Sequence, residues 1–204
     1  CLTHNPSTWS VCQTGATSDG YGESENIPVT HTRSVFFVDG RYWVIFDRAR
    51  PADDREHLYE SIFMLDAPDA AAEGNRVVTK RSGTNLAIIA AAVDGQTADV
   101  VQGQMEPVCR GWKRGGETVQ PNPTAVFAQR RRGPATFALL LYPIAKGELV
   151  PQADIEFASV EGGVDPVAVR VMLPGDSQRI LVDQLGEGEV VVEGAGRIST
   201  PGMR

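Results

Sequence analysis

Two apolar runs separated by a turn dipeptide dominate the first third of the chain. The runs 33–38 (RSVFFV) and 42–47 (YWVIFD) are rich in Val, Ile, Phe and Tyr, which is typical of β-strands. Asp39-Gly40 lies between them and favours a tight hairpin, because such pairs tolerate positive φ. Apolar residues fall on both faces of each run, so we expect central strands that are covered on both sides.

Similar runs continue toward the C-terminus and predict an all-β protein. After a charged loop marked by Pro51 and Asp53-Asp54, residues 57–65 (HLYESIFML) complete a group of three central strands. Further strands are expected at 76–81, 85–93, 99–105, 124–130, 136–144, 153–160, 167–173, 178–185 and 189–194. Gly and Pro turns between them indicate an antiparallel, supersandwich-like β-sandwich with little helix. The best helix candidate, residues 67–74, is too short to be stable alone.

The length of the chain fits one large β domain. Its 204 residues lie within the range that sandwiches reach as one unit, and we find no internal repeat or low-complexity segment. We therefore predict a single β-sandwich domain over residues 1–204, with a break between sheets near 143–151.

Charge and hydropathy argue against two classes of partner. The net charge of -7 disfavours nucleic acid, because binding phosphates requires clustered Lys and Arg. The short basic run 130–132 is either a solvated turn or a patch for an anionic ligand such as an acidic sugar. No apolar stretch approaches the roughly 18 residues of a membrane helix, and no signal peptide is recognisable.

The cysteines and the first residue leave alternatives open. Three cysteines are not a disulfide framework; Cys1 and Cys12 are the local candidates for one pair, which only geometry decides. The chain begins with Cys rather than Met, which indicates removal of an N-terminal segment, a piece of a longer reading frame, or a lipidated cysteine.

Few side chains have the pattern of a catalytic or metal site. The three histidines are far apart in sequence, and no HExxH, GxSxG, phosphate loop or calcium loop is present. His31 and His57 each open a strand, where a partly buried, hydrogen-bonded ring is the ordinary alternative to a functional one. Trp43, inside an apolar strand, is predicted to be core, whereas Trp112 lies in a Gly- and Pro-rich stretch that leaves its exposure open.

Several short motifs follow one another along residues 3–145. They are THNPSTWSV at 3–11, His31-x-Arg33, the strand ending at Asp47, His57-x-Tyr59-Glu60, CRGW at 109–112 followed by Pro121 and Pro123, and FALLLYP at 137–143. Their order resembles the C-terminal β-sandwich of the heparinase II/III-like polysaccharide lyases. The first segment is similar to the family's His-Asn-Thr strand, with Pro6 in place of Thr. The resemblance fades after residue 145.

The resemblance implies a part in β-elimination at the uronic acids of an acidic polysaccharide. In this family a base removes the proton beside the carboxylate and an acid protonates the leaving oxygen. An N-terminal α-helical toroid supplies most of those groups. This chain would then be the C-terminal part of a larger periplasmic or secreted bacterial lyase, in which it completes the cleft and supports the toroid. We assign no catalytic residue here and expect the chain alone to be inactive.

Two residues are candidates for contacting substrate, His31 and Arg33. Arg33 suits a carboxylate or sulfate because its planar fork donates two parallel hydrogen bonds; the alternative is an arginine paired with a carboxylate across the sheet. The resemblance also implies that His4, followed by Asn5, is a zinc ligand in the full-length parent. One histidine cannot hold zinc, so no cofactor is expected for this chain alone. The other hypotheses are a stand-alone carbohydrate-binding module and a structural sandwich.

Overall fold

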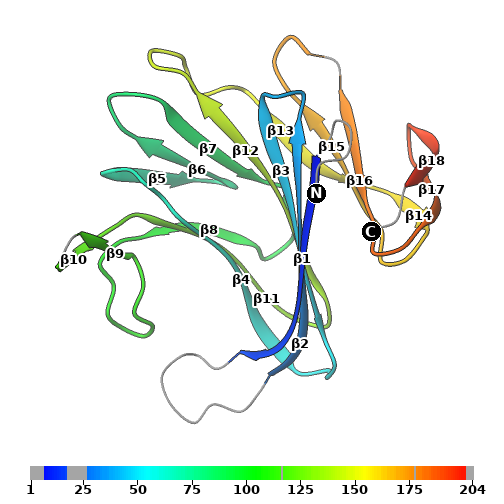
Figure 1. Ribbon diagram of the computed structural model, residues 1–204, viewed down its shortest axis with the longest axis horizontal. Coiled ribbons are helices and arrows are strands. Elements are labelled where there is room, and N and C mark those ends of the chain that lie inside the picture. The colour runs from blue at the N-terminus through cyan, green and yellow to red at the C-terminus, as the bar shows by residue number, and fades with distance from the viewer. Residues whose placement is uncertain (1–6, 18–26, 116, 177, 201–204) are drawn as a thin grey trace.

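A seven-stranded antiparallel sheet runs through the middle of the computed structural model, which describes residues 7–17, 27–115, 117–176 and 178–200 (Figure 1). In spatial order its strands are β1 (Ser7–Thr17), β2 (Ile27–Val38), β3 (Tyr42–Pro51), β12 (Ala135–Ile144), β7 (Asn85–Ala90), β6 (Arg76–Lys80) and β5 (Asp69–Glu73). The tight turn between β2 and β3 has φ values of 50° at Asp39 and 69° at Gly40, as the dipeptide predicted.

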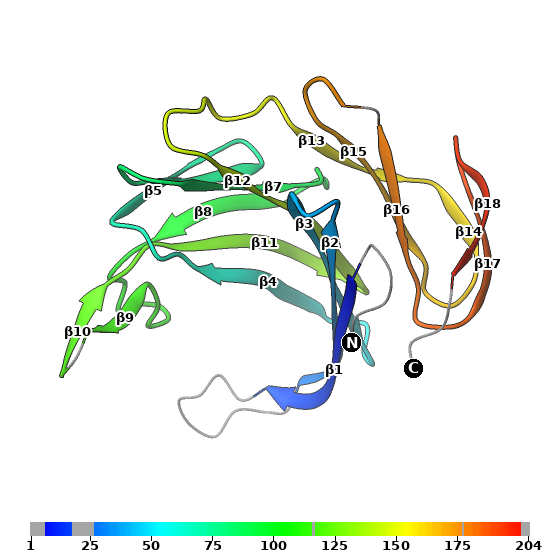
Figure 2. The ribbon, with the colours of Figure 1, turned by 45° about the horizontal axis from the view of Figure 1, so that its top comes forward.

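Two three-stranded sheets lie on opposite faces of this central sheet (Figure 2). The first, which we call the β4 layer, contains β4 (Glu56–Met64), β11 (Thr124–Arg132) and β8 (Thr97–Val101). The second, the β15 layer, contains β13 (Asp154–Ala158), β15 (Val167–Met172) and β16 (Arg179–Asp183). The all-β sandwich is confirmed, and its central sheet is covered twice.

Each layer buries its own hydrophobic cluster. On β3, Tyr42, Val44 and Phe46 belong to the cluster under the β15 layer, whereas Ile45 belongs to the cluster under the β4 layer. Successive side chains of a strand point to opposite faces, so a strand covered on both sides needs apolar residues at both parities. This explains why 33–38 and 42–47 do not alternate. Each large side chain that becomes fully buried contributes roughly 1.5–3 kcal/mol.

Two smaller sheets complete the fold. β14 (Val160–Gly162), β17 (Gly188–Val192) and β18 (Gly196–Thr200) form a sheet that packs on the outward side of the β15 layer through a third cluster. β9 (Trp112–Gly115) and β10 (Thr118–Pro121) form a hairpin at the opposite end of the molecule (Figure 1). The sequence did not predict this hairpin. The predicted break between sheets is confirmed, because β12 ends at Ile144 and β13 begins in another sheet.

The helix candidate at 67–74, which is too short to be stable alone, is absent: residues 69–73 form β5, which pairs with β6 across a turn at Gly74. Two local predictions are wrong. The run 57–65 is not a central strand, since β4 has β11 as its single neighbour among the described strands. Trp43 is half-buried rather than core and stacks on Phe37 with ring centroids 4.8 Å apart. Within the described residues, no helix is long and apolar enough to cross a membrane.

Candidate functional site

A buried carboxylate on β3, Asp47, contacts side chains from two other strands, β2 and β4. Arg33 of β2 donates from Nε and Nη2 to its two oxygens, each at 2.6 Å. His31 Nε2 lies 3.2 Å from Oδ1, and the Ser61 hydroxyl of β4 donates to Oδ2 at 2.5 Å. The register of β2 against β3 places Arg33 directly opposite Asp47, which explains the bidentate geometry. We call these four residues the Asp47 cluster.

The Asp47 cluster stabilises the charged form of its carboxylate. Burial alone would raise the pKa of Asp47, but the hydrogen bonds from Arg33 and His31, the positive charge of Arg33 and the Ser61 hydroxyl outweigh it and hold the pKa at about 2. The hydrogen bond to Asp47 also raises the pKa of the Arg33 guanidinium above its ordinary value, against the effect of burial. Asp47 is therefore ionised at neutral pH and fixes the orientation of both candidate residues.

The structure thus brings together the two residues predicted to contact substrate. The alternative for Arg33 is confirmed, because it pairs with a carboxylate across the sheet. Pairing does not remove it from solvent: the side chains of His31 and Arg33 are 45% and 33% exposed. Among the described residues, none accepts a hydrogen bond from Arg33 Nη1. The guanidinium also lies 5.4 Å from the centroid of the Phe63 ring, which holds it further in place.

His57 occupies a separate corner at the start of β4. Its Nε2 lies 2.5 Å from Asp53 Oδ1, and only 11% of its side chain is exposed. Hydrogen bonds from His57 and Arg55 lower the pKa of Asp53 to about 2. The prediction of a partly buried, hydrogen-bonded histidine is confirmed here. The nearby basic run ends β11, where Arg132 donates to the Asp54 carbonyl at 2.8 Å.

A buried ionic network on the other side of β3 was missed by sequence reasoning. Arg48, whose side chain is fully buried, donates to the Asp183 carboxylate at 2.6 Å and to its carbonyl at 3.0 Å. Arg50 forms a bidentate pair with Asp165 at 2.7 and 2.9 Å. Asp183 lies 135 residues from Arg48 in the sequence, so no local spacing could reveal the pair. Arg48 itself stands in the charged stretch DRAR at 47–50, which does not indicate a fully buried side chain. The network ties the β15 layer to the central sheet.

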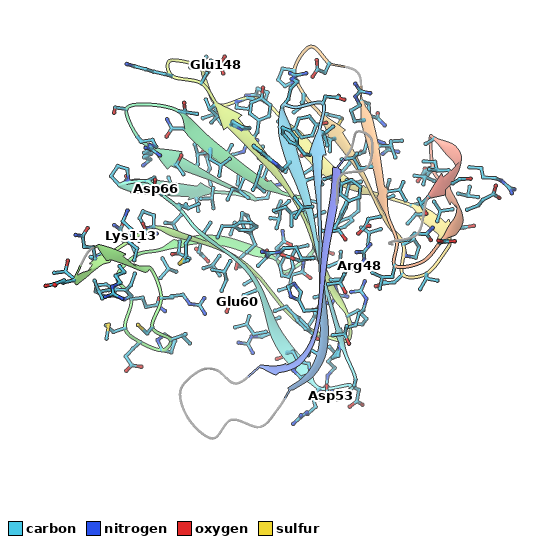
Figure 3. All side chains as sticks on the ribbon, viewed as in Figure 1. Arg48, Asp53, Glu60, Asp66, Lys113 and Glu148 are labelled. Atoms are coloured by element: carbon cyan, nitrogen blue, oxygen red, sulfur yellow. The ribbon has the colours of Figure 1, made fainter. Side chains whose placement is uncertain are left out.

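The CRGW motif forms a tight junction below the β9–β10 hairpin. Gly111 has φ of 76°, and a Cβ there would lie 2.8 Å from both the Gln102 Cα and the Val101 oxygen, so only glycine fits. Arg110 makes a bidentate pair at 2.7 and 2.8 Å with Glu60 of β4. The Glu60 side chain is labelled in Figure 3. Trp112 is half-buried, and its Nε1 donates to the Gln104 carbonyl at 2.8 Å. The motif is therefore a structural clamp that attaches this loop to β4.

The predicted metal ligand and the predicted disulfide fall outside the part of the chain that can be assessed. His4 and Cys1 lie outside the described residues, as does the Cys12 side chain. Among the described residues, no three His, Cys, Asp or Glu side chains converge in a way that suits a metal ion. A zinc ligand at His4 in a longer parent protein stays a prediction.

The sequence matches a profile described as Heparinase II/III-like, C-terminal, over residues 7–145. That range contains the Asp47 cluster, the His57 corner and the CRGW clamp. No curated protein matches the chain. The matched range ends within the loop after β12, so the β15 layer lies beyond it.

Solved structures share the fold of nearly the whole chain. The heparinase III BT4657 gene product is 17% identical, with a TM-score of 0.68 over 90% of this chain and 26% of its own. The heparan sulfate lyase HepC from Pedobacter heparinus is 19% identical, with a TM-score of 0.66 over 90% of this chain and 27% of its own. A structure of heparinase III has a TM-score of 0.65 at 13% identity. The chain spans about a quarter of the length of these proteins.

Proposed function

The chain belongs to the heparinase II/III-like family through its C-terminal domain, and on this basis we propose that it is the C-terminal β-sandwich of a polysaccharide lyase. The parent enzyme would cleave a uronic-acid-containing polysaccharide by β-elimination. In this proposal the sandwich completes the substrate cleft and supports an N-terminal helical toroid, which carries the catalytic groups. The parent would be a periplasmic or secreted bacterial protein.

The family match over residues 7–145 carries the proposal, and the convergence of His31 and Arg33 on one fixed carboxylate supports a substrate contact within it. Asp47 uses Nε and Nη2 of the Arg33 fork, and both candidate side chains keep solvent-accessible surface. A guanidinium held in one orientation loses little entropy when it binds an anion, and its Nη1 can donate to a carboxylate or sulfate oxygen. These features support a role as a positioned anion contact. They supply no base or acid for the elimination itself.

The decisive experiment compares this chain with the polypeptide extended by the in-frame coding sequence upstream of Cys1. Both proteins are incubated with heparan sulfate, alginate and neutral dextran, and the absorbance of the unsaturated uronate product is followed. We expect product from the extended protein with a uronate polysaccharide, and none from the chain alone. Product from the chain alone, or no product from the extended protein with any uronate substrate, would contradict the proposal.

Two variants of the extended protein test the anion contact. Arg33→Lys keeps the charge but loses the planar fork, and His31→Gln removes the ring. We expect either to raise KM by about tenfold with a smaller change in kcat, the size of one charge-assisted hydrogen bond. Arg41→Lys, in the exposed pair with Asp176, is the matched control and should leave KM unchanged. An unchanged KM in both test variants would exclude His31 and Arg33 as substrate contacts.

Comparing the chain with the extended polypeptide also distinguishes the lyase proposal from the other hypothesis, a stand-alone carbohydrate-binding or structural sandwich. A stop codon and a ribosome-binding site directly before the codon for Cys1 would favour it. Glycan binding by the chain alone would then indicate a binding module, and no binding would indicate a structural role.

A further inference from the structure

The ring of His31 has a second nitrogen, Nδ1, that Asp47 does not use. Its Nε2 lies 3.2 Å from Asp47 Oδ1, and an ionised carboxylate can only accept hydrogen bonds. Nε2 therefore carries a hydrogen both in the neutral ring and in the imidazolium. The proton that the ring gains or loses is consequently the one on Nδ1. Among the described residues, none forms a hydrogen bond with this atom.

The Asp47 cluster is electrically neutral as long as the His31 ring is neutral. The positive charge of Arg33 is balanced by the negative charge of Asp47, and the Ser61 hydroxyl carries none. Uptake of a proton at Nδ1 gives the cluster a net positive charge and turns Nδ1 from an acceptor into a donor. Imidazole groups make this change between about pH 5 and 8. The attraction of the cluster for an anion therefore depends on the protonation of His31.

Two donors, Nη1 of Arg33 and the protonated Nδ1 of His31, are available to one anion. Both residues lie on the same face of β2, two positions apart, so their Cα atoms are about 6.6 Å apart. Their side chains are partly exposed, and none of the described residues accepts from Arg33 Nη1. A carboxylate or sulfate has several acceptor oxygens, so a single such group can accept from both side chains.

The residues that pair with His31 on the neighbouring strands carry no titratable group. Gln13 of β1 and Ala49 of β3 lie opposite it. The nearby charged residues of β3, Arg48 and Arg50, point to the other side of that strand and are paired with carboxylates there. On β2 and β3, the charges that face His31 are therefore those of the Asp47 cluster itself.

The titratable residues on the inward face of β4 already have partners. This face carries His57, Tyr59 and Ser61, since side chains alternate along the strand. His57 lies 2.5 Å from Asp53, and the Tyr59 hydroxyl donates to the Gly133 carbonyl at 2.8 Å. His57 thus has a carboxylate partner of its own, outside the Asp47 cluster.

We propose that the Asp47 cluster is an anion site coupled to protonation of His31, so that Arg33 binds a carboxylate or sulfate group more tightly as the pH falls. This inference rests on the proposed function, because it takes the anion to be a charged group of an acidic polysaccharide. A sugar carboxylate stays ionised above about pH 5, so the charge that changes is that of the protein. The coupling is reciprocal: a bound anion also favours the protonated ring.

NMR titration of the histidine rings in this chain tests the coupling. The probes are sodium sulfate and sodium glucuronate, and sodium chloride at equal ionic strength is the reference. With at least one probe at saturation, we expect the midpoint of the His31 titration to rise by about 0.7 pH unit or more, a coupling of about fivefold. The probe with the larger effect identifies the group that the site prefers.

His57 is the internal reference for this titration. Its side chain is 11% exposed, against 45% for His31, and its partner is Asp53. We expect its midpoint to be the same in the probe and in the chloride reference. A His31 midpoint that does not move with either probe would overturn the proposal, and so would equal shifts of both rings.

Removing the guanidinium should abolish the effect of the probes on His31. We expect no shift of the His31 midpoint in Arg33→Gln, while an unchanged His57 signal shows that the fold is intact. Arg41→Gln, in the exposed pair with Asp176, is the matched control and should keep the full shift. A shift that survives Arg33→Gln would contradict binding at this guanidinium.

The guanidinium carbon signal of Arg33 gives an independent readout that does not need a variant of Arg33. In the chain itself, we expect sulfate to bind about fivefold or more tightly at about pH 5.5 than at about pH 8. In His31→Gln the affinity should be the same at both values. A pH dependence that persists in His31→Gln would assign the coupling to another group and overturn the proposal.

The coupled anion site and the lyase function fail in different ways. A chain that shows the shift of His31, together with an extended protein that forms no unsaturated uronate, would keep the anion site and exclude the lyase function. A lyase-active extended protein, together with a chain in which neither probe moves the His31 midpoint, would keep the function and exclude the coupling.

Discussion

The β4 layer and the β15 layer cover opposite faces of one sheet but differ in what they turn outward. The outward face of the β15 layer carries the ion pair of Glu156 and Arg170, and β14, β17 and β18 pack over part of it. The outward face of the β4 layer carries Leu58, Ile62 and Met64, and none of the described strands covers them. The β15 layer thus turns an ion pair outward, whereas the β4 layer turns three exposed apolar side chains outward.

The inward sides of the layers differ as well. The side chains of consecutive β3 residues point toward different layers, because side chains alternate between the two faces of a strand. Asp47 faces the β4 layer and accepts from Ser61 and the partly exposed Arg33. Arg48 faces the β15 layer and is sealed against Asp183. One attachment keeps partly exposed side chains, whereas the other is sealed from solvent.

Removing the sealed attachment should have the largest effect. In Asp183→Ala, the fully buried Arg48 guanidinium would lose its closest carboxylate and keep the backbone carbonyl of residue 183, at 3.0 Å, and the Asp165 carboxylate, 3.7 Å from its Nε. We expect the free energy of unfolding to fall by about 3–5 kcal/mol, because an uncompensated buried charge is costly. Urea unfolding at pH 7 measures it.

A double variant and an exposed pair serve as controls for that loss. Arg48→Met combined with Asp183→Leu removes both charges and should recover much of the stability. Asp176→Ala breaks an exposed pair with Arg41 and should cost far less. A small loss in Asp183→Ala would mean that the β15 layer is held by its apolar contacts alone.

Disrupting the Asp47 cluster should have a smaller effect that depends on pH. Asp47→Asn leaves Arg33 without its carboxylate, and we expect a loss of about 2 kcal/mol at pH 7. The pKa of Asp47 is lowered from 3.8 to about 2 on folding, so its contribution is complete above about pH 4 and disappears as the pH falls toward 2. Stability curves of the wild type and the variant should therefore converge over that window.

The control for this prediction is a second depressed carboxylate. Asp53 also has a pKa of about 2, so the wild-type curve alone would combine two titrations. The difference between wild type and Asp47→Asn isolates one of them. A difference that stays constant from pH 7 to pH 2 would show that the charge of Asp47 contributes nothing.

Much of the central sheet was predictable from the sequence because its signals are local. The β-rich runs at 33–38 and 42–47, the Asp39-Gly40 turn and the apolar residues at both parities all follow from neighbouring positions. The wrong prediction that 57–65 is a central strand also came from a local signal. Apolar residues on both faces indicate a covered strand, and β4 has that pattern while its outward face is exposed. Apolar residues at both parities therefore do not by themselves show that a strand is covered on both faces.

Long-range pairing marks the limit of such reasoning. The segment containing His31 and Arg33 was identified from its motif, and a carboxylate partner was one of the alternatives. That Ser61 completes the cluster depends on β4 packing over β3, which no spacing shows. The network of Arg48, Arg50, Asp165 and Asp183 joins residues more than 100 positions apart, and only the fold reveals it. Polar contacts between layers are therefore the part that sequence reasoning misses.

The smallest expected effect concerns the ion pairs on the two outward faces. In the pair of Glu60 and Arg110 the side chains are 21% and 17% exposed, and the contact is bidentate, whereas Glu156 in the pair with Arg170 is 48% exposed. Double-mutant cycles with alanine should give a coupling energy of about 1 kcal/mol for the first pair and less than about 0.5 kcal/mol for the second. Equal values would remove the distinction between the two faces.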